Sequence, residues 1–259
     1  MAEQLVQLRR DGDVATVMLA RPAKLNSLTP AMLDALEHCA RELDADTQVR
    51  IVILTGDGDK AFCVGADINE WAALQPLDMW RRWVRRGHQV FDQWARLRLP
   101  VIVAINGHAF GGGLELAMTG DIRIACESAQ FALPEASIAT CPGWSGTQRL
   151  VQLVGASRAK YLALSGRRLS AADALAAGLV HEVVAAASLR QRSLELAREM
   201  ATKAPVSLQL TKQLVNAAAG EDQAATLEAI AGALAATTDD AAEGIGSFRE
   251  KRPPRYLGR

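Results

Sequence analysis

Three consecutive glycines and the glutamate that follows them form the segment of the sequence most suited to chemistry. In INGHAFGGGLELAMTGD, residues 105–121, a strand-like run ends in a loop, passes through Gly111–Gly113 and enters a helix near Leu114. Glycine carries no Cβ, so a ligand oxygen can approach the unpaired N–H groups of such a turn, where the helix dipole favours negative charge. An isolated run of three glycines is equally typical of a tight turn that only relieves backbone strain. Glu115, in the first helical turn, would then be a surface acid that complements the dipole.

A second acid, Glu135, follows twenty residues after Glu115. It comes directly after Pro134 in FALPEASIATCPGWSGTQRL, residues 131–150, among apolar neighbours. Burial would raise the pKa of its carboxyl group toward the range useful for proton transfer, although a solvated loop glutamate is the commoner fate of such a residue. Two carboxyl groups at one site would provide a general acid and a general base.

A third segment, KAFCVGADINEW at residues 60–71, contains a strand-like run that ends at Gly65 before a helix. A turn of this kind can supply a second group of free backbone N–H groups. The glycine-rich segment at 105–121 lacks both the GxGxxG spacing and the GK[ST] ending of nucleotide-binding loops. The sequence therefore favours a site where these N–H groups bind a ligand oxygen that carries negative charge, and it does not favour a nucleotide-binding loop.

Two short motifs suggest a serine hydrolase as a different class of enzyme. GWSGT, residues 143–147, resembles a nucleophile elbow but lacks its final glycine. SRAK, residues 157–160, matches the SxxK pattern, which is short enough to arise by chance. The acid/base chemistry that two glutamates offer makes hydrolysis the weaker hypothesis.

A basic and aromatic segment, MWRRWVRRGHQVFDQWARLRL at residues 79–99, suggests a non-catalytic RNA-binding or scaffold protein. Interleaved arginine and tryptophan can bind nucleic acid. The apolar residues recur at helical spacing, however, which favours a stripe that packs against the core or an interface while the arginines are solvated. This stripe comprises Trp80, Trp83, Val84, Gly87, Val90, Phe91 and Trp94.

The elements that must hold these side chains alternate along the first two thirds of the chain. Short β-branched runs at 14–19, 49–56, 101–107 and 121–126 predict strands, and their nearly continuous apolar character indicates burial on both faces. A helix is predicted to begin at Pro30 with Thr29 as its N-cap. Strands that alternate with helices indicate an α/β fold. Nearly everything after Ser188 is rich in alanine and leucine and predicts helix.

Composition excludes several classes of protein. The chain carries 29 basic and 29 acidic residues, so it lacks the long-range field expected of a protein that binds nucleic acid or a membrane surface. Its four cysteines show no paired or metal-ligand spacing, so we predict neither disulfides nor a metal site. The N-terminus has no apolar run of signal length, and no run of about 18 apolar residues occurs elsewhere. We expect a soluble, cytoplasmic protein.

Together these motifs resemble the enoyl-CoA hydratase/isomerase (crotonase) family, in the family's order and over almost the whole chain. The matching segments are RPAKLNSL (21–28), AFCVGADI (61–68), INGHAFGGGLELAMTGD (105–121), LPEASIATCPGWSGTQRL (133–150), LSGRRLSAADALAAGLVHEVV (164–184), APVSLQLTKQLVN (204–216) and TTDDAAEGIGSFREKRPP (237–254). The resemblance implies an α/β fold: a spiral of ββα units over 1–195 that carries the active site, and a helical trimerisation region over 196–259. It also implies a homotrimer or a dimer of trimers.

The resemblance further implies an acyl-CoA thioester as substrate, so that coenzyme A enters as part of the substrate and no separate cofactor is needed. The backbone N–H groups of Ala66 and Gly112 would form an oxyanion hole for the thioester oxygen. Glu115 would be the base that activates water, Glu135 the acid that protonates C2, and the N–H of Gly143 would help to position the water. Which glutamate carries the proton at rest stays open, because a close pair titrates as a unit.

Other residues are implied to bind the CoA portion. They are Lys24, Ala66, Asp67, Ile68, Asn69 and Gly112, with Phe248 or Lys251 of a neighbouring subunit near the nucleotide end.

Three residues depart from the family pattern. Val64 replaces a usually smaller residue, Ala139 a common glycine, and Trp144 stands where many members have alanine or glycine. An indole beside the water site would reshape the acyl pocket, so we expect an altered substrate range, with a short or unusually shaped acyl group. Simple isomerases typically need only the glutamate that matches Glu135. The presence of both glutamates therefore favours hydration, with isomerisation or another crotonase-family lyase or hydrolase reaction as the alternative.

Overall fold

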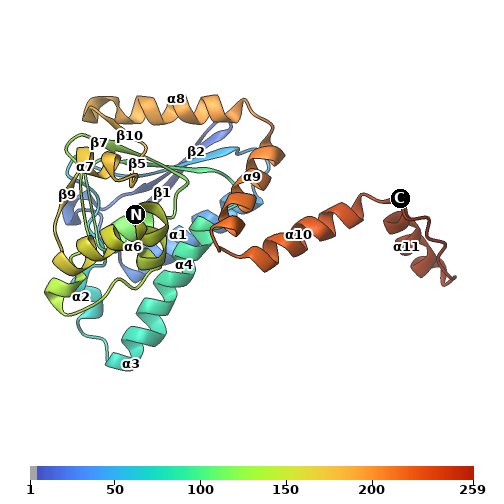
Figure 1. Cartoon of the computed structure of the whole chain (residues 1–259), viewed down its shortest axis with the longest axis horizontal. Coiled ribbons are helices and arrows are strands. Elements are labelled where there is room, and N and C mark those ends of the chain that lie inside the picture. Colours follow the sequence, from blue (N-terminus) through green and yellow to red (C-terminus); the bar gives the residue numbers. More distant parts are fainter. Residues whose placement is uncertain (1–4) are drawn as a thin grey trace. The chain divides into compact units, whose positions relative to one another are not determined.

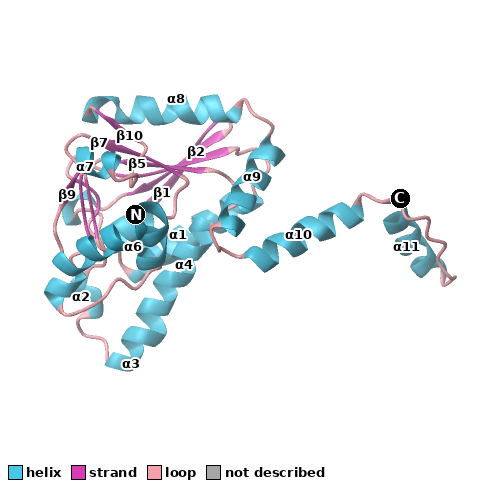
Figure 2. Ribbon diagram, in the orientation of Figure 1, coloured by secondary structure: helices cyan, strands magenta, loops and turns pink. Residues whose placement is uncertain are grey.

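The computed structural model describes residues 5–259, and the chain forms two compact units, Met1–Leu210 and Thr211–Arg259. Figure 1 traces the chain, and Figure 2 distinguishes its helices from its strands. The boundary expected between residues 195 and 196 falls inside α8 (Leu189–Ala201), which lies against β2, β3, β5 and β7 of the first unit. No helix among residues 5–259 is both long enough and apolar enough to cross a membrane.

A six-stranded sheet forms the centre of the first unit. The first two strands pair antiparallel, and every other neighbouring pair is parallel. All of β5 and most of β3 and β7 are buried, which confirms the burial expected from their continuous apolar sequences. In spatial order the strands are β1 (Val6–Asp11), β2 (Val14–Leu19), β3 (Ile51–Gly56), β5 (Val101–Ile105), β7 (Ile122–Cys126) and β10 (Glu182–Val184).

A second sheet of four short strands brings together the three chemistry-bearing segments. Its strands are β4 (Ala61–Cys63), β6 (His108–Phe110), β8 (Gln130–Ala132) and β9 (Leu169–Ser170). Strands β3, β5 and β7 of the first sheet are followed by β4, β6 and β8 of the second, and a helical segment then follows each pair. The expected spiral of ββα turns is therefore confirmed. Because β4, β6 and β8 are parallel neighbours, their carboxyl ends meet at one edge.

The helical segments that follow these strands begin at that edge and are short. They are α2 (Ile68–Trp71) after β4, α5 (Gly112–Ala117) after β6 and the 3-10 helix η3 (Glu135–Ile138) after β8. Longer helices complete the unit: α1 (Pro30–Ala45), α6 (Gly146–Ser165) and α7 (Ala171–Ala176). Thr29 caps α1 as predicted, because its hydroxyl accepts a hydrogen bond from the Met32 N–H at 3.2 Å.

The aromatic stripe lies on a continuous helical segment that contains a π-helical turn. The segment comprises α3 (Pro76–Asp78), η2 (Met79–Val84) and α4 (Arg85–Ala95). Trp83, Phe91 and Trp94 are buried, so most of the stripe faces the core rather than a nucleic acid. Trp80 is the exception, because it is 54% exposed and lies 5.8 Å from the guanidinium of Arg85. A π turn is often found at a functional site, and this one contributes side chains to the cavity described below.

The second unit is helical, as its alanine- and leucine-rich sequence predicts. It contains α10 (Gln223–Ala236) and α11 (Asp239–Glu250), while α9 (Pro205–Ala218) spans the division between the units. The last residues turn back along α11, where the N–H groups of Leu257 and Gly258 donate to the Asp240 carboxylate at 2.6 and 2.7 Å.

Candidate active site

A cavity of about 250 Å³ lies at the carboxyl ends of β4, β6 and β8. Glu115 and Glu135 both line it, in walls that are otherwise mostly apolar. Electrostatic interactions are stronger beside such apolar walls than in bulk water. The structure therefore brings together two acids that are twenty residues apart in the sequence.

Two backbone N–H groups lie side by side at this cavity, in Ala66 and Gly112. A Cβ placed on Gly112 would lie 3.6 Å from the Ala66 nitrogen, and one placed on Gly65 would lie 3.1 Å from the Gly112 nitrogen. Gly65 and Gly111 have φ angles of +97° and +51°, so these turns need glycine. Gly112 begins α5, where the first N–H groups have no intrahelical acceptor. The two N–H groups can both donate hydrogen bonds to one oxygen of a ligand.

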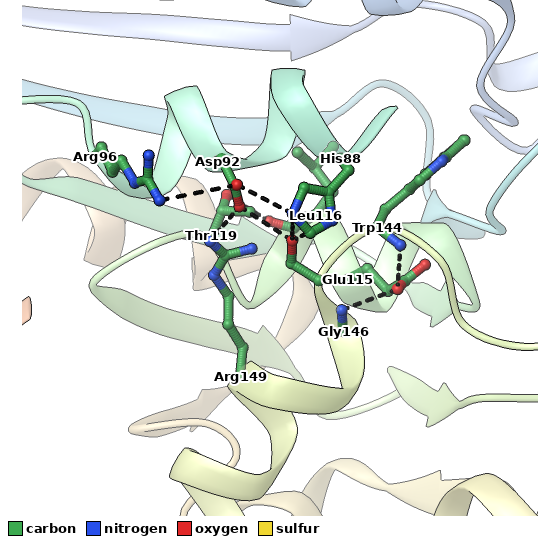
Figure 3. Close-up of polar contacts among 10 residues, drawn as sticks. His88, Asp92, Arg96, Glu115, Leu116, Thr119, Trp144, Gly146 and Arg149 are labelled. Atoms are coloured by element: carbon green, nitrogen blue, oxygen red, sulfur yellow. Dashed lines mark hydrogen bonds and ion pairs between the residues drawn. The ribbon is translucent and has the colours of Figure 1, made fainter. Parts of the chain in front are cut away.

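Glu115 is almost completely buried on α5. Its Oε1 accepts hydrogen bonds from the N–H groups of Trp144 at 2.9 Å and Gly146 at 3.0 Å, as Figure 3 shows. Burial, together with the nearby charge of Glu135, raises the pKa of this carboxyl group to about 7, although the two N–H donors and the charge of Arg149 oppose the shift. The group can therefore exchange a proton near neutral pH.

Glu135 reaches the same cavity from η3 and is also buried. Burial raises the pKa of its carboxyl group. Its Oε1 lies close to Gly111, where a Cβ would approach to 2.9 Å, and its Oε2 is buried without a hydrogen-bond partner among residues 5–259. Burying an oxygen without a hydrogen-bond partner costs free energy of folding. The Oε2 atom of Glu135 can therefore bind a ligand atom or a proton in the cavity.

Comparison with known proteins agrees with this geometry. The family model described as enoyl-CoA hydratase/isomerase matches residues 9–259. A short-chain-enoyl-CoA hydratase of Clostridium acetobutylicum is 39% identical over 249 residues, which cover 95% of each chain. A crotonyl-CoA hydratase of Syntrophomonas wolfei is 34% identical over the full length of both chains. The crystal structure of an enoyl-CoA hydratase from Bacillus anthracis superposes with a TM-score of 0.82 at 38% identity, covering 99% of this chain and 100% of that one.

The chain belongs to the enoyl-CoA hydratase/isomerase family. The structure also locates the three residues that were expected to depart from the family pattern. Val64 lines the cavity. Ala139 has a φ of +56°, in the left-handed region that glycine adopts more easily.

Trp144, another of these departures, also lines the cavity. Its buried indole packs against Trp83, with ring centroids 5.3 Å apart, and against Phe91, at 5.1 Å. Gly87 on α4 and Gly112 on α5 leave the space for it, because a Cβ on either would approach the indole to 2.2 or 2.8 Å. Gly143, the residue expected to position water, lines the same cavity beside it.

Only some of the residues expected to bind CoA line the cavity. Ala66, Ile68 and Gly112 line the cavity, whereas the Asp67 carboxylate caps α2 and pairs with Arg21 at 2.6 Å. Arg21 holds the pKa of Asp67 below its usual range. Asn69 donates to Asp67, and Lys24 is exposed at the end of the 3-10 helix η1 (Pro22–Lys24). Phe248 and Lys251 lie in the second unit.

Sequence reasoning missed a polar cluster beside Glu115. His88 and Asp92 of α4 meet the Ser145 hydroxyl, and Arg149 of α6 donates to Asp92 at 2.9 Å. Nothing in the sequence connects His88 with a serine 57 residues away. Ser145 does not line the cavity, and its hydroxyl donates to Asp92, which does not suit the hydrolase role suggested by GWSGT.

Proposed function

We propose that this protein is an enoyl-CoA hydratase, which adds water across the double bond of a 2-trans-enoyl-CoA to give a 3-hydroxyacyl-CoA. The observation that carries the proposal is the presence of two buried carboxyl groups, Glu115 and Glu135, in one apolar cavity beside the paired N–H groups of Ala66 and Gly112. The names of the relatives support the same reaction and an acyl-CoA thioester as substrate.

The reaction requires charge stabilisation at one atom and two proton transfers at others. As water attacks C3, electrons move onto the thioester oxygen, and the N–H groups of Ala66 and Gly112 stabilise that enolate. Glu115 takes the proton of the attacking water, while the N–H of Gly143 helps to orient it. Glu135 delivers a proton to C2 on the same face. These steps use only carboxyl groups and backbone amides, so no separate cofactor is needed. Coenzyme A enters as part of the thioester substrate.

Double-bond isomerisation is the alternative reaction for this site. It moves one proton between C2 and C4 and therefore needs one carboxyl group. Here Glu115 is as deeply buried as the core and is held by two N–H donors, an arrangement that isomerisation does not require. Hydration uses both groups and is favoured for that reason.

The decisive experiment follows the loss of ultraviolet absorbance of crotonyl-CoA on addition of purified protein. Glu115→Gln and Glu135→Gln should each lower kcat by about 10²-fold or more, because each removes a general acid or base. Glu127→Gln, an exposed glutamate after β7, is the matched control and should retain full activity. Hydration that survives in Glu115→Gln would contradict the role of Glu115 as the base, whereas wild-type protein that isomerises a 3-enoyl-CoA without hydrating crotonyl-CoA would redirect the proposal to an isomerase.

We further propose that Trp144 narrows the substrate range toward short acyl groups. Its indole and that of Trp83 line a cavity that is small for a ligand site. Trp144→Ala should therefore shift the ratio of kcat/KM toward longer 2-enoyl-CoAs in a series from C4 to C12. An identical chain-length profile in the variant and the wild type would contradict this role.

Assembly and location complete the proposal. We propose a homotrimer or a dimer of trimers that forms through the helical region, supported by exposed apolar side chains on α10 and α11. We also propose a cytoplasmic location. The four cysteines support a reducing compartment, because Cys39, Cys63, Cys126 and Cys141 are all free thiols.

A further inference from the structure

The turn that holds Glu115 is built around a serine in an unfavourable backbone conformation. Trp144 and Gly146 both donate their N–H groups to Oε1 of Glu115, at 2.9 and 3.0 Å. Ser145 stands between them with a φ of +69°, in the left-handed region. A residue with a Cβ adopts this conformation only at a cost in free energy, so another interaction must hold the turn in place.

The Ser145 side chain supplies that interaction. Its hydroxyl lies 2.9 Å from Nδ1 of His88 and donates to Oδ1 of Asp92 at 3.0 Å. Nε2 of His88 lies 3.2 Å from the other oxygen of Asp92, and Arg149 donates to Asp92 at 2.9 Å. In Figure 3, Asp92 and Arg149 lie toward the left of the view, and Glu115 with its N–H donors Trp144 and Gly146 lies toward the right.

These hydrogen bonds from the Ser145 hydroxyl to His88 and Asp92, called the tether below, join two elements that lie far apart in the sequence. His88 and Asp92 belong to α4, whereas Ser145 is the N-cap residue of α6 and Arg149 lies near the start of that helix. Ser145 is buried and does not line the cavity, so its hydroxyl acts on the turn and not on a substrate. What the hydroxyl fixes is the direction of the two N–H groups that flank it.

We propose that Ser145, tethered to His88 and Asp92, is a positioning residue for Glu115. The tether holds the 144–146 turn in its left-handed conformation, so that two N–H groups converge on one oxygen of the catalytic carboxyl group. The inference rests on the proposed role of Glu115 in hydration. It assigns a task to a polar cluster that the acid/base mechanism leaves unused.

Loss of this interaction should change the pKa of Glu115 as well as the rate of turnover. The two N–H donors favour the ionised carboxylate, so a loosened turn raises the pKa of Glu115. The other charged groups around it are Glu135 from η3 and Arg149 from α6, while His88, Asp92 and Arg96 of α4 surround the tether. A change confined to the tether leaves Glu135 in place.

The test compares Ser145→Ala with Ser193→Ala by crotonyl-CoA hydration over a range of pH. Ser193 is a matched control, because it is equally buried, donates to a carbonyl of its own helix α8, and has no contact with the site. Ser145→Ala should lower kcat about tenfold with little change in KM, since it misplaces a catalytic group without touching the substrate. The limb of the pH profile that Glu115 governs should move to higher pH. Ser193→Ala should change neither.

Two further variants separate the tether from general destabilisation. Ser145→Gly should lose less activity than Ser145→Ala, because glycine adopts the left-handed conformation without the tether. His88→Ala should lower kcat in the wild-type background but add nothing in Ser145→Ala. Independent effects of the two substitutions, or an unchanged kcat and pH profile in Ser145→Ala, would overturn the inference. Failure of the proposed function is distinguishable, because the wild type would then not hydrate crotonyl-CoA, and failure of the Glu115 role would appear as hydration retained in Glu115→Gln.

Discussion

Glu115 and Glu135 acquire raised pKa values in different surroundings. Glu115 is more deeply buried, but two N–H donors stabilise its ionised form. Glu135 keeps one buried oxygen without a hydrogen-bond partner in the described part of the chain. Because each carboxylate disfavours ionisation of the other, the pair loses its protons in two steps. Hydration in either direction needs one proton on the pair, to supply one acid and one base.

The first prediction concerns the pH dependence of kcat/KM in the free enzyme. Activity should be bell-shaped, because the fully protonated pair has no base and the fully ionised pair has no acid. Glu115 has a pKa of about 7 while Glu135 is charged, so loss of the last proton places the alkaline limb near pH 7. Initial rates at low crotonyl-CoA concentration from pH 4 to 9 measure this. A profile that stays flat between pH 6 and 8 would contradict the assignment.

The second prediction concerns stability at the same residue. A carboxyl group whose pKa is raised by folding stabilises the folded state at low pH, and that stability is lost as the pH rises through the folded pKa. A rise from 4.5 to about 7 corresponds to roughly 3 kcal/mol. Glu115→Gln removes this dependence, so urea unfolding should show the variant more stable than the wild type at pH 8. At pH 4 the two should be nearly equal, and a difference that does not change with pH would exclude this origin.

At the scale of elements, α4 and α5 are shaped to hold the indole of Trp144. Gly87→Ala should destabilise the protein by about 1–3 kcal/mol, because its Cβ would overlap the indole. In a Trp144→Ala background the same substitution should cost nothing, since the space is then empty. Thermal unfolding of the two single variants and the double variant measures the coupling. Additive effects would show that the two residues do not share this space.

How much of this arrangement the sequence could predict depends on whether the signal is local. Thr29 as an N-cap, the buried strands β3 and β5, and the glycine turn before Glu115 all depend on neighbours in the chain, and the structure confirms them. The meeting of Glu115 with Glu135 came from resemblance, because no periodicity specifies the second sheet. The tether from Ser145 to His88 was missed, because it joins two helices whose packing is not encoded in either segment alone.

At the scale of the whole molecule, α10 is the helix with the most apolar sequence and no buried side chain. Its sequence QAATLEAIAGALAA contains one charged residue, Glu228, and it has no fully buried side chain in the single chain. Leu227 and Leu234 are 60% and 68% exposed, and Phe248 on α11 is 85% exposed. A helix that is apolar on every side is expected to be covered, and other copies of the chain would cover it in the proposed trimer.

Charge placed on that helix should therefore disrupt assembly. Leu234→Glu puts a charge among surfaces that a trimer would bury, whereas Gln223→Glu adds the same charge at an exposed polar position of α10. Sedimentation velocity at micromolar concentration should show a trimer or hexamer for the wild type and Gln223→Glu, and smaller species for Leu234→Glu. Because burying a carboxylate without a partner costs several kcal/mol, dissociation should be pronounced. A wild-type protein that sediments as a monomer would rule out the proposed assembly and leave the apolar surface of α10 to a different partner.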